Sequence, residues 1–275
     1  MTVSTAAFDY VRDLVAGRSG IALESRQAYL ADARLAPVAR AAGLGSVDDL
    51  VARLRIAPSG GLATQVVEAM TTNETSFFRD IGPFEALAQE VLPELMRRRA
   101  QTRTLTIWSA ACSSGQEPYT IAMLLRERFP ALAGWRVTIV ATDLSSQMVE
   151  RARAGRFSQL EVNRGLPARL LVKHFTRAGT QWQISDDLRR AVEFRQLNLV
   201  GDRPPLPAAD VVFLRNVLIY FATPTKRAIL GKVRSVLRPD GTLFLGGAET
   251  TLNLDDGFKR VQLGHGPSYR LKGVR

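Results

Sequence analysis

The chain has 275 residues, 46% of them hydrophobic and 23% charged, which is ordinary for a globular protein of one large domain or two modest ones. Its N-terminal residues lack a basic start followed by an apolar run, and no stretch of 18 apolar residues occurs. We therefore expect no signal peptide and no membrane insertion. A single cysteine, Cys112, excludes an intramolecular disulfide and favours a reducing, cytoplasmic location. With only His174 and His265 beside it, no metal site is expected.

The net charge of +11 is distributed unevenly along the chain. Residues 1–75 hold 7 Lys and Arg against 8 Asp and Glu, whereas residues 76–275 hold 30 against 18. The basic character therefore belongs to the second part of the chain. It is compatible with a polyanionic partner and with an acidic protein surface.

Residues 1–70 predict an all-α domain. Apolar residues recur at helical spacing from Phe8 onward and again from Val47 to Leu54, with Ser46 placed to cap the later helix. A Pro- and Gly-containing break at 57–61 precedes a further helix, and no strand signal occurs. Within "ARLAPVARAAGL" (33–44), Pro37 predicts a break or a new helix start.

From residue 105 onward, short β-branched or aromatic runs alternate with helical segments. This pattern is typical of a parallel sheet covered on both faces. "RPDG" (238–241) predicts a turn between a helix and a strand, and the polar, basic stretch 156–191 predicts a small insertion after the second strand. The predicted strands are "LTIWSA" (105–110), "VTIVATD" (137–143), "VEFRQLN" (192–198), "DVVFLRN" (210–216) and "GTLFLGG" (241–247).

The segment "WSAACSSGQEPYTIAML" (108–124) predicts a strand, a loop of small residues and a helix. Ligands bind at this edge of doubly wound sheets, where small residues allow the backbone to approach closely. The loop has one glycine, Gly115, rather than the three of dinucleotide folds, and Glu117 supplies an acid suited to a cationic ligand. A favourable charge in the first helical turn is an equally good explanation of Glu117.

Asp143 ends the second predicted strand, where an acid commonly holds the two ribose hydroxyls of a nucleoside. A helix N-cap is the alternative explanation for a single Asp at this place. Taken together, Gly115, Glu117 and Asp143 indicate an adenosyl ligand without phosphates, and S-adenosylmethionine is the obvious candidate.

Four segments occur in order along the chain: "TTNETSFFRD" (71–80), "WSAACSSGQEPYTIAML" (108–124), "ATDLSSQMVERARAG" (141–155) and "FLRNVLIYF" (213–221). Together they resemble the chemotaxis receptor methyltransferases, the CheR family of protein-glutamate O-methyltransferases. The resemblance covers nearly the whole chain. It implies an α/β fold: a class I (Rossmann-like) methyltransferase domain over 81–275 with a β insertion at 156–191, an all-α domain over 1–70, and a linker at 71–80 that contacts the cofactor.

The same resemblance implies site residues. Arg79 and Tyr220 are expected to be catalytic, although a tyrosine in "LIYF" is also explained as core. Phe77 and Phe78 are expected to anchor the linker. The expected contacts to S-adenosylmethionine, or to its product S-adenosylhomocysteine, are Asn73, Thr75, Arg79, Glu117, Asp143, Asn198, Leu199, Arg215 and Asn216.

The implied reaction is methyl transfer to glutamate side chains of a chemoreceptor. A glutamate is already ionised at neutral pH, since its reference pKa is about 4.3, so no general base is needed. The expected partner is the acidic helical surface of the receptor's cytoplasmic domain. Arg34 and Arg40 keep part of the family's basic docking patch, the short hairpin region 173–188 predicts no bound pentapeptide tether, and we expect a monomer.

Two alternatives from other classes stay open. The charge favours a nucleic-acid methyltransferase, but Arg215-Asn216-Val217-Leu218 stands where amino-group methyltransferases carry Asp/Asn-Pro-Pro-Tyr/Phe. We therefore expect no nucleic-acid partner. A non-catalytic, cofactor-binding signalling regulator is the second alternative.

Overall fold

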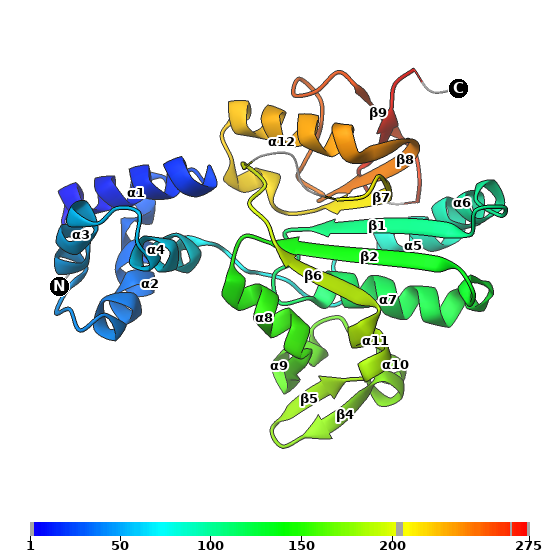
Figure 1. Cartoon of the computed structure of the whole chain (residues 1–275), viewed down its shortest axis with the longest axis horizontal. Helices are drawn as coiled ribbons and strands as arrows, with labels where there is room; N and C mark the ends of the chain where they lie inside the picture. The colour runs from blue at the N-terminus through cyan, green and yellow to red at the C-terminus, as the bar shows by residue number, and fades with distance from the viewer. Residues whose placement is uncertain (1–2, 202–205, 265, 274–275) are drawn as a thin grey trace. The chain divides into compact units, whose positions relative to one another are not determined.

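The computed structural model describes residues 3–201, 206–264 and 266–273, so His265 lies outside the described residues. The chain divides into two compact units, which Figure 1 shows. The first unit contains the residues up to Thr72 together with Tyr220–Thr225, and the second contains Asn73–Ile219 and the residues from Lys226 onward.

The first unit is helical, as the sequence predicts. Ser46 caps α3 as expected, since its Oγ accepts a hydrogen bond from Asp49 N at 3.1 Å. The segment Tyr220–Thr225 joins this unit through a hydrogen bond from Ala22 N to Tyr220 O and an isolated bridge between Ile21 and Phe221. The helices are α1 (Thr5–Ser19), α2 (Ala28–Ala41), α3 (Val47–Ile56) and α4 (Gly61–Met70), with a short 3₁₀ turn at Ser25–Gln27.

The prediction that Pro37 interrupts its helix is wrong, because α2 runs through it to Ala41. Pro37 and Ala33, the residue whose carbonyl loses its partner, both lie on the exposed face of α2. Water can therefore hydrate that carbonyl. Leu35, on the opposite face, is fully buried and holds the helix against its neighbours.

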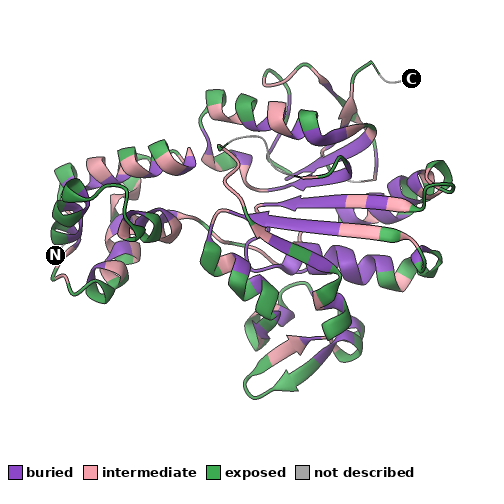
Figure 2. Cartoon of the chain, in the orientation of Figure 1, coloured by how far each residue is buried: buried purple, intermediate pink, exposed green. Residues whose placement is uncertain are grey.

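The second unit is built on a seven-stranded sheet in the order β6-β2-β1-β7-β8-β10-β9. The first five of these strands are mutually parallel, and β10 is antiparallel to both β8 and β9. Figure 2 shows that the central strands are largely buried. The strands are β1 (Thr104–Ala110), β2 (Arg136–Asp143), β6 (Val192–Gln196), β7 (Ala209–Leu214), β8 (Leu237–Leu245), β9 (Phe258–Val261) and β10 (Ser268–Leu271).

Helices alternate with these strands and bury apolar faces on the sheet. The predicted "RPDG" turn is absent as such, because β8 begins at Leu237. Its pairing with β7 shifts from Ala209–Leu237 to Val211–Thr242, so residues 238–241 form an irregularity inside the strand. The helices are α5 (Gly82–Ala86), the π-helical turn η2 (Leu87–Val91), α6 (Leu92–Arg98), α7 (Gln116–Arg128), α8 (Ser146–Ala154) and α12 (Thr223–Val236), with short 3₁₀ turns at Pro130–Leu132 and Leu218–Tyr220.

The β insertion between β2 and β6 is confirmed as a separate antiparallel sheet in the order β3-β5-β4. The hairpin of β4 and β5 turns at Gly179, whose φ is +61°. The elements of the insertion are β3 (Arg156–Ser158), α9 (Gln159–Asn163), α10 (Ala168–His174), β4 (Phe175–Ala178), β5 (Gln181–Ile184) and α11 (Asp186–Arg190).

Candidate functional site

Four parallel strands end side by side at the carboxyl edge of the large sheet. In the register of the sheet, Ala110 of β1 pairs with both Thr142 of β2 and Leu214 of β7, and Asp143 pairs with Gln196 of β6. Asp143, the loop that follows Ala110, and the residues after Gln196 and Leu214 therefore gather at one edge. All four predicted strand-end positions are brought to this edge.

The loop after β1 is fixed by Asp143. One oxygen, Oδ2, accepts a hydrogen bond from Ser113 N at 2.8 Å, and Oδ1 accepts one from Ser145 N at 2.9 Å. The N-cap of α8 is Ser145, so the alternative explanation of Asp143 as the cap is wrong. Ala111 and Ser113 have φ values of +54° and +51°, a left-handed conformation that is costly for residues with a side chain.

Arg215, which follows β7, is the buried centre of a charge network. Its Nη1 lies 2.8 Å from Glu117 Oε2, and its Nη2 lies 3.1 Å from Asp80 Oδ2 and 2.6 Å from the carbonyl of Arg79. Glu117 also accepts a hydrogen bond from Ser109 Oγ at 2.8 Å. Glu117 therefore lies in the first turn of α7 and is also ion-paired, so part of its charge is balanced by Arg215.

Residues 73–80 lie across this edge and are held at several points. The carbonyl of Asn73 accepts a hydrogen bond from Ser113 Oγ at 2.8 Å, and Phe78 N donates to Thr120 Oγ1 of α7 at 3.1 Å. Arg79 donates from Nη1 to the carbonyl of Glu74 at 2.9 Å, which folds its side chain back along the segment. This segment and the loop after β1 are thus one connected structure.

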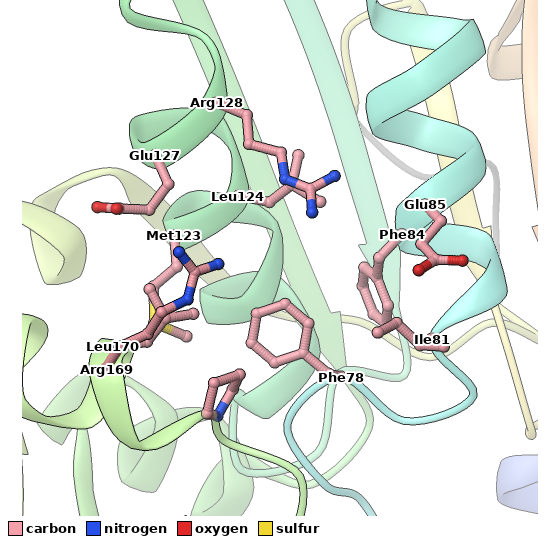
Figure 3. Close-up of a pocket in the computed structure, with 11 residues that line it drawn as sticks. Phe78, Ile81, Phe84, Glu85, Met123, Leu124, Glu127, Arg128, Arg169 and Leu170 are labelled. Atoms are coloured by element: carbon pink, nitrogen blue, oxygen red, sulfur yellow. The ribbon is translucent and has the colours of Figure 1, made fainter.

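The two phenylalanines of the segment have different environments. Phe77 is fully buried, whereas Phe78 is half-buried and has a φ of +50°. Figure 3 shows the Phe78 ring at an open pocket that Met123 and Leu170 also line. Phe77 is therefore the residue that anchors the segment in the core.

Glu249 is a site residue that sequence reasoning missed. Its carboxylate is buried and accepts four backbone hydrogen bonds, which tie the end of β8 to the loop after β7. Oε2 accepts from Asn216 N and Gly246 N at 2.8 and 2.7 Å, and Oε1 accepts from Val217 N and Leu218 N at 2.8 and 2.6 Å. The acid in "GGAET" gave no spacing signal because its partners are backbone groups, three of them 31–33 residues away.

Lys232 of α12 was also missed. It donates from Nζ to the carbonyls of Leu199, Val200 and Gly201, at 3.1 Å for Leu199 and 2.7 Å for Val200. The side chain of Asn198 accepts a hydrogen bond from Val200 N at 3.0 Å. The loop after β6, which carries the predicted Asn198 and Leu199, is therefore held from α12.

Two domain models of one family match successive parts of the chain. The CheR methyltransferase all-alpha domain matches residues 6–71, and the CheR methyltransferase SAM binding domain matches residues 73–266. The chain belongs to the CheR methyltransferase family. It is an S-adenosylmethionine-dependent methyltransferase, and the fold class predicted from the sequence is confirmed.

Known members of the CheR family match this chain over nearly its full length. It is 44% identical to chemotaxis protein methyltransferase 1 of Pseudomonas aeruginosa and 41% identical to chemotaxis protein methyltransferase Cher2 of Pseudomonas putida. It is 39% identical to a chemotaxis protein methyltransferase of Vibrio parahaemolyticus. Each alignment covers 99% of this chain and 100% of the relative.

The residues at the carboxyl edge fit the cofactor of a CheR methyltransferase. Carboxylate oxygens accept more than one hydrogen bond each, so Asp143 can serve ribose hydroxyls while it holds the loop. The Nε of Arg215 is buried and has no hydrogen-bond partner among the described residues. A bound polar group would satisfy it. Asp80, Arg215 and Gly247 also line an open pocket beside this network.

Cys112 lies in the loop after β1. Burial, followed by the neighbouring Asp143 and Glu117 carboxylates, raises the pKa of the Cys112 thiol well above its usual range. The thiol is therefore a poor nucleophile at neutral pH. Tyr220 is half-buried and belongs to the helical unit, and its catalytic role stays a prediction.

None of the helices in the described ranges combines the length and the apolar character needed to cross a bilayer.

Proposed function

We propose that this CheR-family enzyme transfers the methyl group of S-adenosylmethionine to glutamate side chains of a chemoreceptor, as a step in chemotaxis adaptation. The observation that carries the proposal is the match of both CheR domains, together with full-length similarity to chemotaxis protein methyltransferases. A cytoplasmic location follows, since the receptor's methylated domain faces that compartment.

The proposed cofactor contacts extend over the carboxyl edge. Asp143 accepts from the ribose hydroxyls, Asn198 and Leu199 border the adenine, and Glu117 faces the cationic end of the cofactor. Asn73, Thr75, Arg79, Arg215 and Asn216 complete the set. The proposed domain limits are 1–70 for the helical domain, 71–80 for the linker and 81–275 for the catalytic domain.

The proposed reaction needs no general base from the protein. S-adenosylmethionine supplies a methyl group made electrophilic by its sulfonium. The glutamate oxygen forms a bond to that methyl carbon while the carbon–sulfur bond breaks, and the electron pair stays on sulfur. Because the carboxylate is already ionised near pH 7, the protein's task is alignment, which can contribute about 7–11 kcal/mol to lowering the barrier. We assign Arg79 and Tyr220 to the orientation of the carboxylate.

The proposed partner surface is acidic and helical. The basic insertion of the enzyme has less unpaired positive charge with which to bind that surface than its composition suggests. Residues 151–195 hold 10 Lys and Arg, but seven of these form an ion pair with a carboxylate among the described residues. Arg34 caps α4 through hydrogen bonds to the carbonyls of Met70 and Thr71, so Arg40 is the more available of the two predicted docking arginines. We also propose that the short β4–β5 hairpin binds no receptor pentapeptide and that the enzyme is a monomer.

A labelled-methyl assay tests the proposal. The enzyme is incubated with S-[methyl-³H]adenosylmethionine and either the cytoplasmic domain of a chemoreceptor or total RNA. We expect base-labile label, released as methanol by alkali, on receptor glutamates, at a rate that falls as salt rises. Label on RNA supports the nucleic-acid alternative. Cofactor binding without any transfer supports the regulator. Titration with a receptor-tail pentapeptide should show no binding, and micromolar affinity would refute the absence of a tether.

A further inference from the structure

We infer that the β insertion holds the cofactor-contacting segment 73–80 in its binding conformation, so that residues of the insertion are positioning residues for S-adenosylmethionine. The inference rests on the proposed function in one respect, namely that segment 73–80 contacts the cofactor. It assigns to the insertion a role within the catalytic domain itself.

The first observation is an aromatic cluster that joins the segment to the insertion. The ring of Phe77 lies 5.0 Å from that of Phe157 in β3 and 5.8 Å from that of Phe175 in β4, both in edge-to-face geometry. Phe157 also packs edge-to-face on Tyr119 of α7, at 6.1 Å. Such pairs stabilise beyond the burial of their area. The anchor of the segment therefore lies in the core of the insertion.

The second observation is a close backbone contact. Gly165, in the loop between α9 and α10, has a φ of +88°, and a Cβ placed on it would lie 2.0 Å from the carbonyl oxygen of Phe77. No side chain fits at this position without displacement of the segment backbone. Arg164, the preceding residue, pairs with Glu74 at the start of the segment, and this pair lowers the pKa of Glu74.

The third observation is that the segment is under local strain. Phe78 and Asp80 both have φ values of +50°. Residues held in this region persist when their surroundings fix them. Figure 3 shows Phe78 facing Arg169 and Leu170 of the insertion across the pocket, on the side opposite Phe84. Phe77, Phe78 and Glu74 therefore all have neighbours in the insertion.

The test compares two glycine-to-alanine variants within the insertion. Gly165→Ala places a methyl group against Phe77. Gly179→Ala is the matched control, because Gly179 also has a left-handed φ, +61°, but a Cβ there meets nothing within 4 Å. Binding of S-adenosylhomocysteine is measured by calorimetry on the folded full-length variants. We expect Gly165→Ala to weaken binding at least tenfold and Gly179→Ala to bind within twofold of the parent.

A kinetic measurement separates positioning from general destabilisation. In Gly165→Ala the KM for S-adenosylmethionine should rise, while the KM for the receptor domain should stay within twofold. Parental cofactor affinity in a folded Gly165→Ala enzyme would overturn the inference. Should that variant not fold, Phe175→Leu removes one ring contact with Phe77 and inserts no atom. It should weaken binding severalfold, and unchanged affinity there also overturns the inference.

Thr75→Ala separates this inference from the proposed function. When Thr75→Ala weakens binding and Gly165→Ala does not, the segment contacts the cofactor but the insertion does not position it. When neither variant changes the affinity, the proposed contact between segment 73–80 and the cofactor is itself wrong.

Discussion

The two edges of the large sheet both carry buried charges but use them differently. At the amino edge, Asp210 is 1% exposed and accepts hydrogen bonds from Thr106 N and from Arg99 Nε, at 2.8 and 3.1 Å. Arg99 also pairs with Asp240 at 2.6 Å, and Arg238 Nε lies 3.3 Å from Asp210. The acids here are neutralised mainly by arginines, so this edge consists of ion pairs that stabilise the fold.

At the carboxyl edge the acids mainly fix backbone shape. Within the described part of the chain, Asp143 and Glu249 between them accept at least six backbone hydrogen bonds. Five of the seven described non-glycine residues with positive φ lie at this edge, namely Phe78, Asp80, Ala111, Ser113 and Asn216. Two of them, Ser113 and Asn216, are held through their N–H groups by Asp143 and Glu249. Strained backbone fixed by its surroundings is typical of a site that must be rigid before its ligand arrives. The same sheet is therefore stabilised at one edge and preorganised at the other.

The largest effect is expected from Glu249→Gln. The amide nitrogen of Gln would face backbone N–H donors in place of one carboxylate oxygen, and each lost hydrogen bond to a charged group costs about 1.5–3 kcal/mol. We expect kcat/KM to fall about 100-fold as the loop that carries Asn216 loosens. Glu193→Gln, which changes an exposed acid, is the control. A fall of less than threefold in Glu249→Gln would show that the loop keeps its shape without the carboxylate.

A paired substitution tests the difference between the edges directly. Asp143→Asn should weaken S-adenosylhomocysteine binding about 10- to 100-fold, because each hydrogen bond to a charged group contributes about 1.5–3 kcal/mol. Asp210→Asn should leave that affinity within twofold but lower the melting temperature by several degrees. Calorimetry and thermal unfolding measure both quantities. The distinction fails if Asp210→Asn weakens cofactor binding as much as Asp143→Asn does.

The amino edge also makes a prediction about pH. A hydrogen bond from Arg99 holds the pKa of Asp240 below its ordinary value of 3.8. A depressed pKa contributes stability that is present above about pH 4 and is lost as the pH falls through the folded-state value. Asp240→Asn should therefore cost about 1.5–3 kcal/mol at pH 7, and this difference should shrink as the pH drops below 3.8. Thermal melts at several pH values measure it, and a pH-independent difference would contradict the ionic account.

The smallest effect is expected from Lys232→Met. The substitution removes a cation that holds three carbonyls of the loop after β6 but leaves the apolar stem of the side chain. Each hydrogen bond from a charged group contributes about 1.5–3 kcal/mol to holding this loop. Lys232 acts on the loop and is not one of the proposed cofactor contacts, so we expect the Kd for S-adenosylhomocysteine to rise only about threefold. Lys226→Met, on the same helix, is the control. Equal affinities of the two variants for S-adenosylhomocysteine would show that Lys232 does not support the cofactor site.

Strand ends and helix caps were the parts that the sequence could predict. Hydrophobic runs located β1 and β2 to within one residue, and therefore placed Asp143 at the correct edge. Glu249 and Lys232 were missed because they act on backbone groups, which have no sequence signature. Pro37 was misread because it lies on an exposed helix face, where α2 continues through it. "RPDG" was misread because its residues form an irregularity inside β8 and not a turn before it.

Hydrogen exchange with and without S-adenosylhomocysteine tests the assignment of the two edges most directly. The account predicts added protection at saturating ligand in segment 73–80, in the loop after β1, and around Asp143, Asn198 and Asn216. The amino edge, around Thr106 and Asp210, should exchange at the same rate in both states. Protection confined to the amino edge, or none at the carboxyl edge despite saturated binding, would contradict the assignment of the cofactor site.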